Sequence, residues 1–331
     1  MIKQLFFIFC FTLLISSVCH AVPLDKAEVD RFVDYMVVTH QFDRDGLLKV
    51  FSQTTKSERV LNAISKPAEA LPWHKYRSIF IQTRRIEKGA NFWRLHQALL
   101  ERAAKEYGVP PEIIVAIIGV ETQYGENTGN DRVMDSLATL AFHYPKRADF
   151  FRKELEHFLV LSRDQEVDPL SLKGSYAGAM GLPQFMPSSY RAYAVDFDGD
   201  GHINIWSNPA DAIGSVANYF REHGWQPGGM VTVPASTRGN KYLVALNKDL
   251  KPDIPVDQLY TYDIDLSEEI PPGENVKVLS LQTETGEDIW LCLHNFYVIT
   301  RYNHSGLYAM AVYQLAQEIR NRMQSPSASY G

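Results

Sequence analysis

The feature that most constrains the fold is an apolar run that ends in a carboxylate, at residues 113–121. Seven of the eight residues before Glu121 are apolar, and the eighth is Gly119. A helix of this composition has no polar face for solvent, so we expect it to be buried on nearly all sides. Burial disfavours the ionised form of a carboxylate and raises its pKa. The run therefore predicts either a glutamic acid that stays protonated near neutral pH, as a general acid requires, or a glutamate that marks the exposed end of a core helix.

Residues 1–21 differ in character from the rest of the chain. Lys3 supplies a basic start, residues 5–15 form an apolar stretch, and residues 19–21 offer the small residues of a signal-peptidase site. About 20 apolar residues are needed to cross a bilayer, and this stretch is shorter. We therefore predict a signal peptide cleaved near Ala21 and export to the periplasm. The alternative is an outer-membrane lipoprotein attached through Cys19, for which the preceding valine is a poor lipobox residue.

Composition argues against a disulfide-stabilised protein and against a nucleic-acid-binding protein. Of the three cysteines, Cys10 and Cys19 lie in the predicted leader, so only Cys292 remains and no intrachain disulfide is possible. Stability must then come from a hydrophobic core, for which an apolar content of 45% is sufficient. Removal of the leader lowers the net charge from −6 to −7, which argues against nucleic acid as the main partner. We expect Cys292 in a buried strand, and we expect the protein to be a monomer.

Helical spacing dominates the chain up to about residue 224. We predict helices over residues 92–107 with Asn91 as the N-cap, 111–121, 134–140, 147–161, 209–223 and 308–323. Beyond the glycine-rich residues 224–229 we predict short strands at residues 230–233, 242–246, 259–264, 276–282 and 290–300, with a hairpin at Gly286. The predicted fold class is mainly α (α+β), with a small antiparallel β domain and a last helix that returns to the helical part.

A second motif follows at residues 174–190, Gly-Ser-Tyr-Ala-Gly-Ala-Met-Gly-Leu-Pro-Gln-Phe-Met-Pro-Ser-Ser-Tyr. Its small residues allow a backbone to approach another backbone or a ligand closely. Gln184 offers a hydrogen-bond donor and acceptor, and Phe185 offers an apolar platform. This mixture suits a sugar, which needs hydrogen bonds at its hydroxyl groups and an aromatic surface under its ring. Tight helix packing is an equally good explanation of the motif taken alone.

Together, Glu-Thr-x-Tyr-Gly at residues 121–125 and Ala-Gly-Ala-Met-Gly-x-x-Gln-Phe-Met-Pro-Ser at residues 177–188 resemble the lytic murein transglycosylases of the membrane-bound lytic transglycosylase B family. The likeness extends from about residue 30 to 316 and includes residues 212–220 and 300–305. It implies a lysozyme-like catalytic core flanked by a helical domain and a β domain. The implied division is a signal peptide 1–21, a helical domain 22–100, a catalytic core 101–224, a β domain 225–300, a returning segment 301–323 and a disordered tail 324–331.

The resemblance also implies site residues. It makes Glu121 the single catalytic acid and base, acting on peptidoglycan. The substrate-binding positions that it implies are Ser175, Gln184, Phe185, Tyr302, Asn303 and Tyr308, with weaker support for Tyr76 and Arg147. The family pattern has two adjacent arginines where this chain has Lys146 and Arg147. Lysine cannot repeat a planar bidentate contact, so a carboxylate clamp at residue 146 is not expected.

One carboxylate can be sufficient for this chemistry. Glycosidases ordinarily use two, but the only acidic neighbour in sequence, Glu126, lies in a Gly/Asn-rich loop where we expect it to be solvated. The 2-acetamido oxygen of N-acetylmuramic acid can replace the second group. The prediction is cleavage of the bond between N-acetylmuramic acid and N-acetylglucosamine, with formation of a 1,6-anhydro sugar. The alternatives are a hydrolytic muramidase and a non-catalytic peptidoglycan-binding protein.

Residues 196–204, Asp-Phe-Asp-Gly-Asp-Gly-His-Ile-Asn, match the first nine positions of an EF-hand loop. Position 12 should be glutamate and is Ser207, and Asp211 is the nearest carboxylate that could close a longer loop over residues 196–211. The alternative is a solvated Asp/Gly turn. We predict a structural Ca2+ bound by Asp196, Asp198, Asp200, the backbone carbonyl of His202, and Asp211. No organic cofactor is expected.

Overall fold

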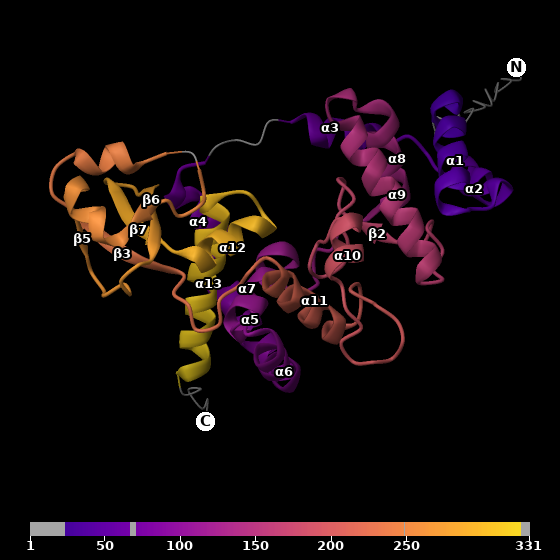
Figure 1. The fold of residues 1–331 in the computed structure, drawn as a ribbon. Helices are drawn as coiled ribbons and strands as arrows, with labels where there is room; N and C mark the ends of the chain where they lie inside the picture. The colour runs from indigo at the N-terminus through magenta and orange to yellow at the C-terminus, as the bar shows by residue number, and fades with distance from the viewer. Residues whose placement is uncertain (1–23, 67–70, 248, 326–331) are drawn as a thin grey trace, which may run out of the picture.

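The computed structural model describes residues 24–66, 71–247 and 249–325, which form a mainly helical protein with a small antiparallel sheet (Figure 1). The predicted fold class is therefore confirmed. The predicted signal peptide, Cys19 and residues 326–331 of the predicted tail lie outside the described residues. Within the described ranges, no helix combines the length and the apolar character needed to cross a membrane.

Helices make up most of the described chain. The α-helices are α1 (Lys26–His40), α2 (Arg44–Ser52), α3 (Glu58–Ser65), α4 (Trp73–Phe80), α5 (Thr83–Leu95), α6 (Gln97–Tyr107), α7 (Pro111–Thr122), α8 (Val133–His143), α9 (Ala148–Asp164), α10 (Pro187–Tyr193), α11 (Pro209–Glu222), α12 (His294–Tyr302) and α13 (Gly306–Gln324). Short 3-10 helices are η1 (Pro145–Arg147), η2 (Lys241–Ala245) and η3 (Val256–Tyr262).

The strands form two sheets. They are β1 (Asp131–Arg132), β2 (Lys173–Gly174), β3 (Thr232–Thr237), β4 (Ile254–Pro255), β5 (Ile264–Leu266), β6 (Asn275–Gln282) and β7 (Glu287–Cys292). β1 and β2 form one antiparallel pair, and the other strands form an antiparallel sheet in the order β4-β6-β7-β3-β5. The predicted hairpin between β6 and β7 is confirmed, since the Thr283 amide donates to the Gly286 carbonyl at 2.9 Å. Cys292 is buried in β7, as expected.

Four local predictions were wrong. Asn91 lies inside α5 and caps nothing; the helix instead breaks at His96, which separates α5 from α6. Residues 242–246 lie mostly in η2, and residues 259–264 lie mostly in η3. Residues 290–300 contain the end of β7 and most of α12. The physical reason is that a short apolar run looks the same in a buried strand and in a buried helix, so tertiary packing decides.

Three hydrophobic clusters hold these elements together. The first surrounds α7 and includes α13 and α11, the second joins α1 and α2 to α8 and α9, and the third lies within the large sheet. α4, α5 and α6 contribute to the cluster around α7 and not to the cluster of α1 and α2. Tyr302 packs against both helical clusters. The site residues near Tyr302 therefore lie where the two helical cores meet.

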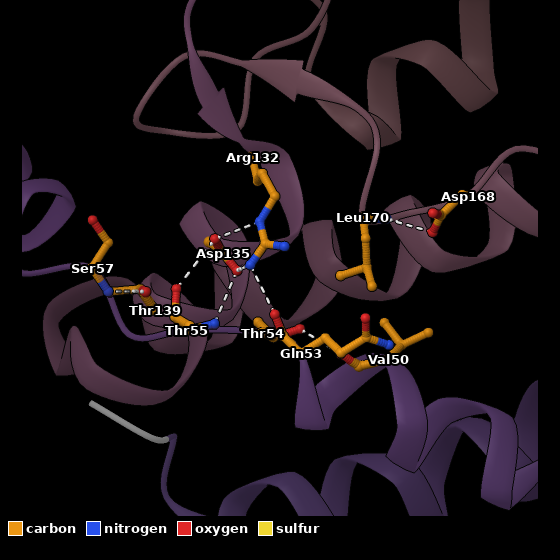
Figure 2. Close-up of polar contacts among 10 residues, drawn as sticks. All are labelled: Val50, Gln53, Thr54, Thr55, Ser57, Arg132, Asp135, Thr139, Asp168 and Leu170. Atoms are coloured by element: carbon orange, nitrogen blue, oxygen red, sulfur yellow. Dashed lines mark hydrogen bonds and ion pairs between the residues drawn. The ribbon is translucent and has the colours of Figure 1, made fainter. Parts of the chain in front are cut away.

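Polar contacts fasten the segment between α2 and α3 to α8 (Figure 2). Arg132 donates to both carboxylate oxygens of Asp135, at 2.7 and 2.8 Å, and to the carbonyl of Gln53 at 2.8 Å. Asp135 also accepts from the Thr55 amide at 2.9 Å. Arg132 lies in β1, which pairs with β2 at the start of the second sequence motif. The N-terminal helices and that motif are thus anchored to the same short stretch of chain.

Gly119 allows the residues after α7 to pack back onto the helix. A Cβ atom at this position would lie 2.5 Å from the hydroxyl oxygen and 2.6 Å from Cζ of Tyr124. The same hydroxyl lies against Gly89 of α5. The absence of a side chain at Gly119 is therefore a packing requirement, because the ring of Tyr124 occupies that space.

We expect Gly119→Ala to destabilise the protein by about 1–3 kcal/mol, the usual penalty for inserting an atom into a packed core. Urea denaturation would measure the free energy of unfolding. Gly286→Ala is the matched control, because a Cβ atom at Gly286 would meet no other atom within 4 Å and the backbone there is not left-handed. Equal stability of the Gly119→Ala and Gly286→Ala variants would contradict the packing argument.

Candidate active site

α7 brings Glu121 to the edge of the core. Pro110 is its N-cap, Pro111 is its first residue, and the helix is buried from Ile113 to Gly119. Proline suits the first turn because no intrahelical partner exists there for its missing amide hydrogen. The predicted buried helix is confirmed. Glu121 itself is partly exposed, so its carboxyl emerges at the boundary of the apolar region.

The chain leaves α7 in an unfavourable conformation. Gln123 and Tyr124 have φ values of 51° and 63°, in the left-handed region that residues with a Cβ rarely adopt. Side-chain bonds hold this turn in place: Thr122 Oγ1 donates to the Leu182 carbonyl at 3.0 Å, and the Tyr124 hydroxyl donates to the Arg85 carbonyl at 3.0 Å. Such outliers persist where the surrounding structure over-determines them, and they cluster at functional sites.

The carboxyl of Glu121 is bound by a tyrosine from the other end of the chain. The hydroxyl of Tyr308, which is buried, donates to Oε1 of Glu121 at 2.6 Å. Burial raises the pKa of Glu121 to about 7, and the bond from Tyr308 opposes this shift only in part. Burial, followed by the charge of Glu121, also raises the pKa of Tyr76 and of Tyr302. Glu121 thus lies among three tyrosines, and no other carboxylate of the described residues acts on its pKa.

Tyr302 lies in an aromatic cluster beside this carboxyl. Its hydroxyl donates to the Pro183 carbonyl at 2.6 Å, and its ring lies 4.8 Å from that of Tyr219 and 5.9 Å from that of Phe185. Phe185 is only 2% exposed, so its ring supports Tyr302 from behind and is not itself a free platform. Tyr219 was not among the residues predicted, although it belongs to the stretch at 212–220 that resembles the family.

Ser175 and Gln184 shape the loop of the second motif. Ser175 Oγ accepts from the Ala179 amide at 3.0 Å. Gln184 Nε2 donates to the carbonyls of Thr128 and Gly181, at 3.1 and 2.9 Å. The bond to Thr128 ties this loop to the one that follows α7, and the bond to Gly181 stays within the loop. Its carbonyl oxygen remains as the group that could accept a bond from a ligand.

The remaining predicted site residues make no hydrogen bond with Glu121 among the described residues. Asn303 is exposed directly after α12, next to Tyr302. Arg147 is exposed in η1, where its guanidinium lies 4.1 Å from the ring centre of Phe150. No contact among the described residues joins Arg147 to Glu121. Glu126 is paired with Lys88 and about half exposed, as predicted for a solvated residue.

The predicted calcium loop brings three carboxylates together. Oxygens of Asp196, Asp198 and Asp211 all lie within 4.8 Å of one another, so this group could bind a metal ion. Asp211 is fully buried at the start of α11 and accepts from the amides of Phe197 and Asn204, at 2.8 and 2.6 Å. Burial raises its pKa, and the charges of Asp198 and Asp196 add to that effect. An all-oxygen set of this kind suits a hard cation.

The other two predicted ligands lie differently. Asp200 is not a member of this group; its Oδ1 accepts from the amide of His202 at 2.8 Å. The side chain of His202 is exposed, and only its backbone carbonyl was predicted as a ligand. Asp211 therefore lies beside Asp196 and Asp198, whereas Asp200 lies outside this group.

Comparisons with known proteins identify the family that this chain resembles. A family model of the transglycosylase SLT domain matches residues 25–317. The membrane-bound lytic murein transglycosylase B of Escherichia coli K12 is 46% identical over 305 residues, covering 89% of this chain and 83% of the relative.

Solved structures of lytic transglycosylases are also similar to this chain. The soluble lytic transglycosylase SltB1 of Pseudomonas aeruginosa matches with a TM-score of 0.86 and 52% identity, covering 90% of this chain and 100% of the other. The Escherichia coli lytic transglycosylase Slt35, solved in complex with calcium, matches with a TM-score of 0.83 and 45% identity, covering 94% of this chain and 99% of the other.

The raised pKa of Glu121 predicts a pH-dependent stability. Below its ordinary pKa of 4.5 the carboxyl is protonated in both the folded and the unfolded chain, so it has no effect on stability. As pH rises from 4.5 to about 7, the unfolded chain ionises while the folded chain keeps its proton, so the folded protein loses stability until its own carboxyl ionises. Glu121→Gln should therefore gain stability over the wild type as pH rises between these limits, by up to about 3 kcal/mol above pH 7, since one pKa unit corresponds to about 1.4 kcal/mol.

Denaturant unfolding of both proteins between pH 4 and pH 8 would measure this gain. Glu126→Gln is the matched control, because the pKa of Glu126 is lowered by its bond with Lys88 and its replacement should give no such gain. A stability difference between wild type and Glu121→Gln that stays constant with pH would contradict the raised pKa.

Proposed function

The chain belongs to the transglycosylase SLT domain family and is a lytic murein transglycosylase that acts on peptidoglycan, and we propose that Glu121 is its single catalytic acid and base. The family membership confirms the activity and the resemblance predicted from the sequence. The observation that supports the role of Glu121 is its partly buried carboxyl, which has a pKa of about 7 and no second carboxylate of the described residues acting on it. A group with that pKa holds a proton it can donate and becomes a carboxylate that can take one back.

The reaction that fits this site is intramolecular. Oε1 of Glu121 accepts the Tyr308 bond, which leaves Oε2 to carry the proton. Glu121 protonates the glycosidic oxygen between N-acetylmuramic acid and N-acetylglucosamine, and the bond from C1 breaks while the 2-acetamido oxygen stabilises the charge at C1. The carboxylate then removes the proton of the muramoyl 6-hydroxyl, whose oxygen bonds to C1. The 1,6-anhydro product forms without water, and Glu121 is again protonated.

The surrounding residues have supporting roles in this proposal. Tyr308 and Tyr302, with Tyr76, form a largely apolar wall that limits the access of water to C1. Ser175 and Gln184 hold the loop that Tyr302 contacts through the Pro183 carbonyl, and the Gln184 carbonyl oxygen can accept from a sugar hydroxyl. Asn303 is exposed beside Tyr302 and can bind an acetamido group. Phe185 contributes by fixing the Tyr302 ring, and Arg147 is a more distant candidate for the peptide-bearing side of the substrate.

The central test is a digest of purified sacculi with wild type and Glu121→Gln. We expect the substitution to reduce cleavage by about 100- to 10,000-fold, the usual contribution of a general acid, because an amide cannot supply the proton. Mass spectrometry of the wild-type products should show anhydro sugars, each one water molecule lighter than the hydrolytic product. Near-normal turnover by Glu121→Gln would eliminate its assigned role.

Two controls separate the alternatives. Glu126→Gln should cleave normally, since Glu126 lies outside the site. Wild-type products that retain the extra water would favour a hydrolytic muramidase. A wild-type protein that binds sacculi but releases no sugar would favour a non-catalytic binding protein.

We also propose that the acidic loop binds a structural Ca2+ through Asp196, Asp198 and Asp211. Three carboxylates so close together repel one another without a cation. The relative Slt35 was crystallised in complex with calcium, which supports the choice of ion. Asp211 already anchors two backbone amides, so the ion would join the loop to α11. The position suggests a role in folding stability and not in the chemical step.

Calcium should therefore raise the melting temperature by several degrees without changing turnover per folded molecule. A free calcium concentration of about 100 times Kd would stabilise the folded state by about 2.7 kcal/mol. Asp198→Asn should abolish the shift with little other effect, because Asp198 is exposed. Magnesium is the control ion, since it prefers a smaller octahedral site. An unchanged melting temperature on addition of calcium or of chelator would refute the site.

We propose that the protein is exported to the periplasm. Residues 1–21 have the composition of a leader, and Cys19 could carry a lipid. Relatives named as membrane-bound and as soluble both match this chain closely. We favour a cleaved leader, with lipid attachment at the outer membrane as the alternative.

A further inference from the structure

A cavity of about 280 Å³ lies between the large sheet and the start of α13. Its wall includes Lys277 of β6, Asn247, and Ser305 to Leu307 at the beginning of the helix. The cavity is next to the active site along the chain, because Tyr308, which bonds Glu121, directly follows Leu307. The proposed function makes no use of this cavity.

Lys277 is an unusual residue for the place that it occupies. It is only 4% exposed, although lysine is rarely buried without a partner of opposite charge. Along β6 it shares a face with Leu279 and Leu281, which pack against the cluster around α7, while Val276 and Val278 face the β cluster. The ammonium group therefore lies at the boundary between the sheet and the helices.

Its charge is not neutralised by contact. No carboxylate of the described residues forms an ion pair with the ammonium, which donates to Asn247 Oδ1 at 2.6 Å and to the Asn247 carbonyl at 3.1 Å. These two bonds leave one of its three N–H donors without a partner. Asp253 accepts from the Asn247 side chain at 3.0 Å and so turns the amide oxygen toward Lys277. The cross-strand neighbour Cys292 stays neutral, since burial raises its thiol pKa to about 12.

The start of α13 adds to the positive character of the cavity. Ser305 is the N-cap of the helix, and its Oγ accepts from the Tyr308 amide. The amides of Gly306 and Leu307 have no hydrogen-bond partner among the described residues. Free amides at the start of a helix, together with the helix dipole, favour an anion. A buried ammonium and a helix N-terminus thus face the same space.

We propose that this cavity binds a carboxylate of the peptide that the muramoyl unit of the substrate carries, with Lys277 as its anchor. The inference rests on the proposed function, because it assigns part of the same substrate. Leu307 in the cavity wall directly precedes Tyr308, whose hydroxyl bonds Glu121, so the cavity and the catalytic carboxyl lie at the same end of α13. Peptidoglycan peptides carry free carboxylates close to the muramoyl unit.

Asp249 offers the competing explanation. It is exposed and also lines the cavity, and its charge, after the larger effect of the Asp253 charge, acts on Lys277 without contact. If Asp249 turned inward as the counter-charge, the cavity would need no ligand. Asp249→Asn separates the two cases: a ligand carboxylate would bind as well or better to this variant, whereas loss of an internal pair would destabilise the fold.

The test uses Lys277→Met in the full chain, with two substrates: glycan strands that carry their peptides and strands stripped of them by an amidase. We expect KM for the peptide-bearing strands to rise about tenfold with kcat unchanged, the effect of losing one charge-assisted contact. Cleavage of stripped strands should not change. Unfolding should show equal or greater stability, because methionine removes a buried charge. Lys251→Met is the control, since Lys251 is exposed nearby.

A second measurement covers the case in which Lys277→Met fails to fold. With the wild type, peptides whose carboxylates are amidated should raise KM about tenfold over the free acids. Equal KM values for amidated and free peptides, or equal effects of Lys277→Met on both kinds of strand, would overturn the inference. Failure of the wild type to cleave either strand would instead refute the proposed function.

Discussion

The contact between the Tyr308 hydroxyl and the Glu121 carboxyl is the interaction on which the site depends. It joins α7 to α13 and links residues that lie 187 positions apart in the sequence. Between them the chain builds the motif loop, the acidic loop and the whole β domain before it returns. The partial burial that raises the pKa of Glu121 is therefore a product of the complete fold. The helix that carries Glu121 would not create this environment by itself.

Several unfavourable features concentrate around this contact. Glu121 has a desolvated carboxyl, and the turn at Gln123 and Tyr124 has a left-handed backbone. Arg85, which accepts the Tyr124 hydroxyl bond at its carbonyl, is 8% exposed and leaves Nε and Nη1 without hydrogen-bond partners among the described residues. Each feature destabilises the folded state, and the apolar cluster around α7 has to offset them. This combination is expected where a site is selected for chemistry and not for stability.

The sequence predicted the long helices better than it predicted the elements of the β domain. Long helices such as α11 and α13 have a periodicity that is visible locally, and their positions were correct within a few residues. Residues 242–246 and 290–300 failed because an apolar run of that length has no distinctive period. The motif at 174–190 was recognised as important, but its rotamers could not be predicted. Phe185 points into the core, and the amide hydrogens of Gln184 bond to backbone carbonyls.

The sequence by itself determined the chemistry that is available: a carboxylate at the end of a buried helix, an Asp-rich loop and a family of motifs in the correct order. Only the tertiary structure decided which groups meet. It placed Tyr308 against Glu121, brought Asp211 to Asp196, and buried Lys277 in a cavity wall where no carboxylate of the described residues contacts it. The physical reason is the distance along the chain over which each effect acts. Composition and periodicity act within a few turns of chain, whereas hydrogen bonds and desolvation depend on distant elements that packing brings together.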